Sequence, residues 1–198
     1  MTINLTKGQR ISLKKEAPKL EQLMCGLGWD IATKKGGFFS QLTQANFDLD
    51  SSVLCLNSRD KISSSQDIIY YGNLRHSSDS ILHQGDNLTG KGEGDDEQIL
   101  VNLPQIPANI HKLIFIVNIY EAIARKQDFS QVKNAFVRLV NLGNRQEIAR
   151  YSLSGMGFEG KTGMIMAEIS RQGDDWEVTA KGEGINVKGL PEIIRSYS

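Results

Sequence analysis

The chain has 198 residues, 39% of them hydrophobic, which suffices for one domain with its own apolar core. Its 23 basic residues balance its 23 acidic ones, so the positive charge expected of a nucleic-acid-binding protein is missing. The two cysteines are too few for a disulfide framework, no apolar run of about 18 residues could span a membrane, and the first residues contain no hydrophobic signal segment. We therefore expect a single domain over residues 1–198 that is cytoplasmic and binds no nucleic acid.

Short runs of β-forming residues, separated by turn residues, follow one another along the chain. In Trp176–Lys181 apolar and polar residues alternate, which is typical of a strand with one buried face. Leu113–Val117 is an unbroken apolar run and predicts a strand in the centre of a sheet, buried on both faces. The complete set of expected strands is Ile3–Thr6, Arg10–Lys14, Leu23–Asp30, Phe47–Leu56, Asp67–Tyr71, Gln98–Leu103, Lys112–Tyr120, Ala135–Leu142, Glu147–Leu153, Thr162–Arg171 and Trp176–Lys181.

Helical pattern is confined to two short segments. Glu121–Gln127 is long enough for a turn or two, and Leu190–Tyr197 has Pro191 near its first helical position, where proline is favoured. Many short strands with so little helix predict an all-β fold, namely an antiparallel β-sandwich with short helical turns.

Gly85–Glu97, which reads GDNLTGKGEGDDE, carries the strongest chemical signal in the chain. It contains five acids, one lysine and four glycines. Carboxylate, amide and backbone oxygens on a flexible segment suit a hard cation such as Ca²⁺, which takes about six to eight oxygen ligands. The alternative is an acidic loop that is simply solvated. Crowded carboxylates repel one another unless a cation or protons lie between them, and this favours ion binding without excluding a solvated loop.

Further acids lie at the ends of other expected strands. In Phe47–Asp50 the alternation places Asp48 and Asp50 on one face. Asp30 ends the preceding strand, and Glu121 follows the apolar strand in the centre of the chain. Each acid alone is an ordinary turn or cap residue. If successive strands alternate in direction, however, all of them reach the same end of the sandwich as the acidic segment.

Other motifs lack essential residues. Asp86–Glu97 has the length of an EF-hand loop, but Leu88 and Gly90 stand where oxygen ligands are needed. Gly85–Lys91 matches the start of a phosphate-binding loop, but Gly92 replaces the Ser or Thr that should follow. The three histidines are scattered without zinc-site spacing. These classes of site are therefore not expected.

Several segments along the chain together form a specific pattern, although none is specific alone. They are Ile3–Gly8, Gly26–Asp30, Phe47–Ser51, Gly85–Gly90, Gly94–Glu97, Ile119–Ala122 and Arg125–Leu139. In this order, and over essentially the whole chain, they resemble the TerD family of tellurium-resistance and general stress proteins.

The resemblance implies a β-sandwich that binds Ca²⁺, usually two ions, through acidic loops at one end. It also implies a stress protein without an established enzymatic activity, with protein partners at the membrane surface, to which it would be peripheral. From the cluster of acids itself, we expect a non-enzymatic module whose interactions depend on bound calcium. Two departures stand out: seventeen residues separate Asp30 from Asp48, and Gly184–Leu190 differs from the family's usual carboxy-terminal pattern. Together with Glu121 from the strand argument, the residues expected to bind metal are Asp30, Asp48, Asp50, Asp86, Asn87, Asp95, Asp96, Glu97 and Glu121.

Two other functions stay open at this point. A metal-assisted hydrolase could use an open coordination position, although no general base or nucleophile stands apart from the expected ligands. A thiol-based tellurite or redox protein could use Cys25 and Cys55 if they are adjacent, whereas two buried, inert thiols are the ordinary alternative.

Overall fold

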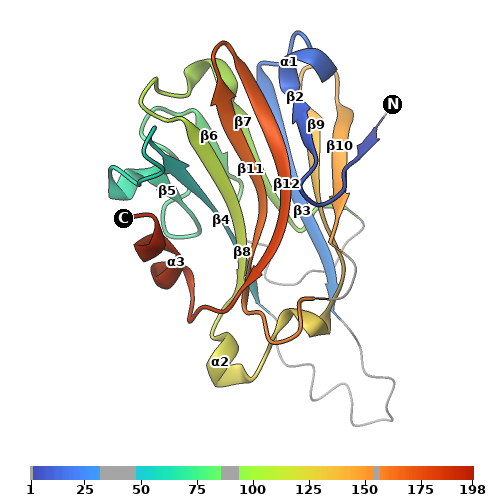
Figure 1. Cartoon of the computed structure of the whole chain (residues 1–198), viewed down its shortest axis with the longest axis vertical. Coiled ribbons are helices and arrows are strands. Elements are labelled where there is room, and N and C mark those ends of the chain that lie inside the picture. The colour runs from blue at the N-terminus through green and yellow to red at the C-terminus, as the bar shows by residue number, and fades with distance from the viewer. Residues whose placement is uncertain (1, 32–47, 86–93, 154–156) are drawn as a thin grey trace.

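The computed structural model, which describes residues 2–31, 48–85, 94–153 and 157–198, is a sandwich of two six-stranded sheets (Figure 1). The first sheet has the strand order β1-β10-β9-β3-β7-β6, and the second has the order β2-β12-β11-β8-β4-β5. The first sheet contains β1 (Ile3–Asn4), β3 (Gln22–Ile31), β6 (Ile81–His83), β7 (Glu97–Asn102), β9 (Val132–Asn141) and β10 (Gln146–Ser152). The second contains β2 (Arg10–Ser12), β4 (Leu49–Leu56), β5 (Ile68–Ile69), β8 (Lys112–Ile119), β11 (Gly163–Gln172) and β12 (Asp175–Ile185).

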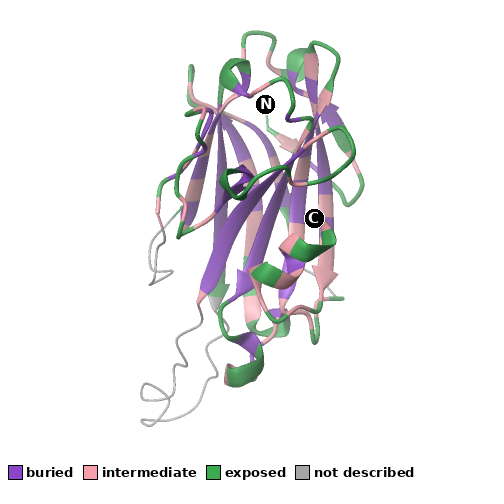
Figure 2. Ribbon diagram, turned by 90° about the vertical axis from the view of Figure 1, so that its left-hand side faces the viewer, coloured by how far each residue is buried: buried purple, intermediate pink, exposed green. Residues whose placement is uncertain are grey.

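The main core lies between the two sheets, because alternate residues of each strand point inward. On β4, for example, Val53 and Cys55 face this core, whereas Leu54 and Leu56 face outward. Strand β8 pairs with β11 on one side and β4 on the other, and all but its first residue are buried, as the unbroken apolar run predicted. Figure 2 shows this burial along the strands.

The outer face of the second sheet has an apolar cover of its own. Helix α3 (Leu190–Ser196) begins with Pro191 in its first turn, as the sequence predicted. Its buried Ile193 belongs to a second, smaller cluster together with Leu54 and Ile116. This cluster explains why the outward residues of β4 and β8 are apolar as well as the inward ones.

The predicted elements and the observed ones differ at a few places. The short strand β6 was not predicted, and β1 pairs with β10 in parallel rather than antiparallel. The end of the predicted strand Arg10–Lys14 belongs to helix α1 (Leu13–Glu16), because the Ser12 hydroxyl accepts from the backbone N–H of Lys15 and caps a helical turn. Only Ile68–Ile69 of the predicted strand Asp67–Tyr71 is a strand.

Four strand ends meet at one end of the sandwich, called the acidic end below. Strand β3 ends and β7 begins there, since Leu27 pairs with Glu97; β4 begins and β8 ends there, since Leu49 pairs with Ile119. Helix α2 (Ala122–Arg125) follows β8 at this end, the lower one in Figure 1. Within the described ranges, no helix has the length and hydropathy needed to cross a bilayer.

Candidate functional site

Glu97 lies between the two sheets at the acidic end. Its side chain is 1% exposed, and its Oε2 accepts a hydrogen bond of 3.0 Å from the backbone N–H of Ser51 on the opposite sheet. The Nε2 of His83 lies 3.5 Å from the same oxygen. The second oxygen, Oε1, is buried and has no hydrogen-bond partner. Glu97 therefore joins the sheets through one oxygen and keeps the other available for a ligand.

His83 fixes the surroundings of Glu97. The backbone N–H of Gly85 donates to His83 Nδ1 at 3.1 Å, so in the neutral ring the proton sits on Nε2. That nitrogen lies 2.8 Å from the hydroxyl of Ser51. The imidazole thus presents an N–H, not a lone pair, to the Ser51 and Glu97 oxygens, and it positions them without itself being a metal ligand.

Asp96 lies beside Glu97 and accepts a hydrogen bond of 2.7 Å from the backbone N–H of Trp29. Burial raises the pKa of Asp96; the Trp29 hydrogen bond opposes this, while the charges of Asp30, Glu97 and Asp95 add to it. Four carboxylates therefore act on one another at the ends of β3 and β7.

Asp95 has different partners from Asp96 and Glu97, because an arginine on the outer face of the first sheet binds its carboxylate. Arg138 donates from Nε to Oδ1 at 2.7 Å and from Nη2 to Oδ2 at 3.0 Å, while Gln98 donates to Oδ2 at 3.1 Å. A Cβ on Gly26 would lie 2.4 Å from the Asp95 carboxyl, so glycine at that position lets the side chain rest on β3. The side chain of Asp95 is fully buried in this arrangement.

Asp48 and Asp50 lie on the other sheet. Asp50 stands opposite Asn118 in the β4–β8 pair, and the pairing continues past β4, where Tyr120 donates its N–H to the Asp48 carbonyl at 2.8 Å. Burial, and next the charge of Asp50, raise the pKa of Tyr71, with smaller contributions that include Asp48. The charges of both carboxylates therefore act on the phenol of Tyr71.

The remaining predicted ligands differ in their surroundings. Asp30 is exposed and accepts a hydrogen bond of 2.7 Å from Asn134. Glu121 is exposed and forms an ion pair of 3.1 Å with Arg125. Asp86 and Asn87 lie outside the described residues.

The described candidates thus share one end of the sandwich but not one face. Glu97 lies between the sheets, Asp95 on the outer face of the first sheet and Asp50 on the outer face of the second. No group of three or more His, Cys, Asp or Glu side chains within residues 2–31, 48–85, 94–153 and 157–198 is arranged to hold a metal ion. A complete cage would therefore need further oxygens, such as backbone carbonyls or the segment that contains Asp86 and Asn87.

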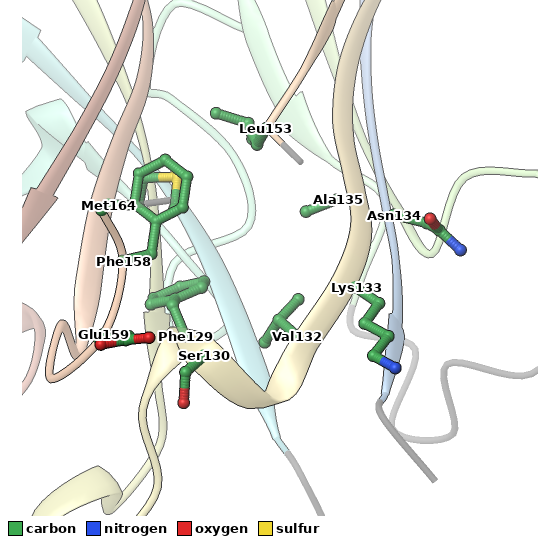
Figure 3. Close-up of a pocket in the computed structure, with 11 residues that line it drawn as sticks. Phe129, Ser130, Val132, Lys133, Asn134, Ala135, Leu153, Phe158, Glu159 and Met164 are labelled. Carbon is green, nitrogen blue, oxygen red and sulfur yellow. The ribbon is translucent and has the colours of Figure 1, made fainter. Parts of the chain in front are cut away.

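A pocket of about 400 Å³ opens near the start of β9 (Figure 3). Phe129, Phe158 and Met164 line one side of it, and Lys133 and Asn134 point away from the apolar lining. Its described lining contains Ser130, Lys133 and Glu159 but no His, Cys or Asp.

The two cysteines are buried in the core, with exposed fractions of 0% for Cys25 and 1% for Cys55. Burial raises the pKa of both thiols far above the ordinary value. Both thiols are therefore protonated at neutral pH, and the thiolate that redox or metal chemistry requires does not form in the folded protein.

The comparisons with known proteins place the chain in one family. The model of the TerD domain matches residues 1–197. The stress response protein SCP2 of Bacillus subtilis (strain 168) is 47% identical over 200 residues, covering 100% of both chains. The tellurium resistance protein TerD of Serratia marcescens is 40% identical over 197 residues, covering 100% of this chain and 97% of the relative.

A solved structure supports the fold independently. The homologue of telluride resistance protein (TerD), SCO6318 from Streptomyces coelicolor A3(2), superimposes with a TM-score of 0.64 at 20% identity, covering 90% of this chain and 98% of that one. The match over nearly the whole sequence, together with the two-sheet sandwich, establishes that this chain belongs to the TerD family of tellurium-resistance and stress-response proteins.

Proposed function

We propose that this protein is a non-enzymatic calcium-binding stress-response protein, in which bound calcium controls the interaction of the acidic end with a partner. The observation that carries the proposal is the Glu97 Oε1 atom, which is buried and has no hydrogen-bond partner. A buried ionised carboxylate without a full set of partners is costly, and a cation removes this cost.

The donor set at the acidic end fits a hard cation. Its candidate ligands are carboxylates, which Ca²⁺ prefers. Burial, and the charges of Asp30, Glu97 and Asp95, raise the pKa of Asp96, so these acids disfavour one another's ionised form. Glu97 and Asp96 would hold one ion together with oxygens from the adjoining acidic segment. When bound, calcium supplies positive charge and orders its ligands; it performs no reaction.

The interaction role follows from the sign of the charge. The acids of this end repel an anionic surface or partner, and two Ca²⁺ ions would add four positive charges. We propose protein partners at the membrane surface, which would make the protein cytoplasmic and peripheral to the membrane.

The two competing functions have less support. A hydrolase needs a nucleophile activated by a general base. In the described lining of the pocket near β9, Ser130 is a hydroxyl candidate, but its hydroxyl donates to Asp128 and no histidine lines the pocket to act as its base. A thiol-based redox function needs an accessible thiolate, whereas Cys25 and Cys55 are buried.

Calorimetric titration with Ca²⁺ and with Mg²⁺, followed by thermal unfolding, tests the proposal. We expect Ca²⁺ to bind more tightly than Mg²⁺, because irregular oxygen sites suit the larger ion. Binding to the folded state stabilises it by about 2.7 kcal/mol at a hundredfold excess over Kd. Glu97→Gln should weaken binding, whereas Glu16→Gln, exposed at the end of helix α1 and outside the expected ligands, should change it little. A wild-type protein whose melting temperature is the same with calcium and with chelator would contradict the proposal.

A further inference from the structure

The turn that precedes β6 carries a cluster of polar side chains that the proposed function does not use. The N–H of Asp79 donates to the carbonyl of His76 at 2.9 Å, and the N–H of His76 donates to the carbonyl of Ile81 at 3.0 Å. Asp79 has a φ of 60°, the left-handed conformation that commonly completes such a hairpin turn. Hydrogen bonds on both sides therefore fix the backbone that carries His76 and Ser78.

His76 is 3% exposed and forms hydrogen bonds through both ring nitrogens. Its Nε2 lies 3.2 Å from Oδ1 of Asp67, which belongs to the 3₁₀ helix η2 (Ser65–Asp67) before β5. Its Nδ1 accepts the backbone N–H of Ser78 at 3.1 Å, so in the neutral ring the proton sits on Nε2 and is donated to Asp67. The lone pair of Nδ1 lies 2.8 Å from the Ser78 hydroxyl. Carboxylate, imidazole and hydroxyl thus follow one another in the order that activates a nucleophilic serine.

The Ser78 hydroxyl is the accessible member of this series. Ser78 is half-buried, and its neighbours Ser77 and Asp79 are exposed. The Oγ of Ser80 also lies 2.8 Å from the Oγ of Ser78, and a hydroxyl hydrogen can rotate between such partners. The Ser78 proton can therefore be directed to Nδ1 of His76.

Asp67 is the charged partner of the imidazole. On the turn itself, Arg75 and Asp79 pair with each other at 3.1 Å. The charge of Asp67 also acts on the buried thiol of Cys55, which is protonated at neutral pH. A carboxylate beside Nε2 stabilises the imidazolium that forms when His76 takes up a second proton.

The cluster is separate from the acidic end. The carbonyl of Ser80 accepts a hydrogen bond of 2.7 Å from the N–H of Asn102, which ends β7, whereas Glu97 begins that strand. At about 3.4 Å per residue, about 17 Å of strand lies between these two levels of the sandwich. We therefore expect chemistry at Ser78 that does not depend on an ion near Glu97.

The backbone of the turn limits what this chemistry can be. The N–H groups of Ser78 and Asp79 donate to Nδ1 and to the carbonyl of His76. The N–H of Ser80 is directed to Oγ of Ser78 at 3.4 Å. Rapid acyl transfer relies on N–H donors aimed at the developing oxyanion, and these three are already engaged. The arrangement thus favours a single acylation of Ser78 over enzymatic turnover.

We propose that Ser78 is an acyl-acceptor site, with His76 as its general base and Asp67 as the residue that positions the imidazole. The substrate class is an activated acyl donor, namely an ester or thioester with a good leaving group. Nδ1 of His76 takes the hydroxyl proton while Oγ of Ser78 forms a bond to the acyl carbon. The bond from this carbon to the leaving oxygen or sulfur breaks, and the leaving group takes the proton from His76. The products are one acyl ester on Ser78 and a free alcohol or thiol.

Acetylation by p-nitrophenyl acetate, mapped by peptide mass spectrometry, tests the site. We expect an acetyl ester on Ser78 that hydroxylamine removes, whereas acetyl amides on lysines resist hydroxylamine. Ser78→Ala should lose this ester, and Ser77→Ala, at the exposed neighbour, is the matched control and should keep it. His76→Gln should slow the reaction at Ser78 about a hundredfold, the contribution of a general base. Asp67→Asn, which keeps an acceptor but loses the charge, should slow it by less.

The wild type alone provides a second measurement, which no misfolded variant can obscure. Ser77 and Ser78 lie in the same peptide, so their esters can be compared within one sample. Native protein should react about a hundredfold faster at Ser78 than at Ser77, and this ratio should approach one in urea. Since only the neutral imidazole accepts a proton, the native rate at Ser78 should also rise with pH and then level off, whereas that of His76→Gln should keep rising.

The possible outcomes are decisive in both directions. Equal reactivity of Ser77 and Ser78 in the native protein, or a wild-type rate in folded His76→Gln, would show that His76 only closes the turn. Fast, hydroxylamine-sensitive acetylation of Ser78 that requires His76 supports the site. The reaction should be the same with calcium and with chelator, so a failed calcium titration leaves this result intact, and a failed acetylation leaves the proposed function intact.

Discussion

The ion pair between Arg138 and Asp95 gives the most direct test of which partners hold the individual carboxylates at the acidic end. The Asp95 side chain is fully buried, Arg138 is 27% exposed, and the pair is joined by two hydrogen bonds of 2.7 and 3.0 Å. Arg138→Met leaves the carboxylate buried with only the hydrogen bond from Gln98. Removing one partner of a buried pair costs about 3–5 kcal/mol, and the partial exposure of Arg138 lowers our expectation to about 2–3 kcal/mol.

Urea and thermal unfolding in chelator measure this loss without interference from metal. For a chain of this size the melting temperature should fall by about 4–12 °C, at about 2–4 °C per kcal/mol. Arg75→Met, which removes an ion pair with both side chains at least 60% exposed, should cost no more than about 0.5 kcal/mol. Asp95→Asn combined with Arg138→Met should recover part of the loss, because the uncompensated charge is gone. If Arg138→Met costs as little as the Arg75 control, the ion pair with Arg138 is not what holds the Asp95 carboxylate. The inference that this pair keeps Asp95 from a metal ion would then be wrong.

Three further predictions concern the rest of the sandwich. Arg171→Met should lower the free energy of unfolding by about 1–2 kcal/mol in urea titrations, because the guanidinium donates to backbone carbonyls of the 106–110 segment and lies 4.3 Å above the ring of Trp176. Burial alone would raise the pKa of Asp175. The hydrogen bonds that its carboxylate accepts, first that from Ser12, lower the pKa by more, so the pKa in the folded protein is depressed. The wild type should therefore exceed Asp175→Asn in stability by a constant amount from neutral pH down to about pH 5. The difference should shrink below about pH 4, where the carboxyl takes up a proton in the unfolded chain while it is still ionised in the folded protein. A constant difference down to pH 3 would contradict this. Cys25 and Cys55 should react with a thiol reagent only in denaturant, and rapid modification of the native protein would revive the redox alternative.

The sequence predicted the fold well where the signal is local. The alternation in Trp176–Lys181 and the apolar run Leu113–Val117 identified a half-buried and a central strand, and both lie in the second sheet as β12 and β8. It missed β6, because three residues are too short for a period to be recognised.

The candidate site was less accessible to such reasoning, because its arrangement depends on pairing between distant residues. The sequence could indicate that the acids share one end, but not that Arg138, 43 residues from Asp95, takes up that carboxylate. Nor could it indicate that the backbone N–H of Ser51, 46 residues from Glu97, bonds one oxygen of that carboxylate and leaves the other without a hydrogen-bond partner.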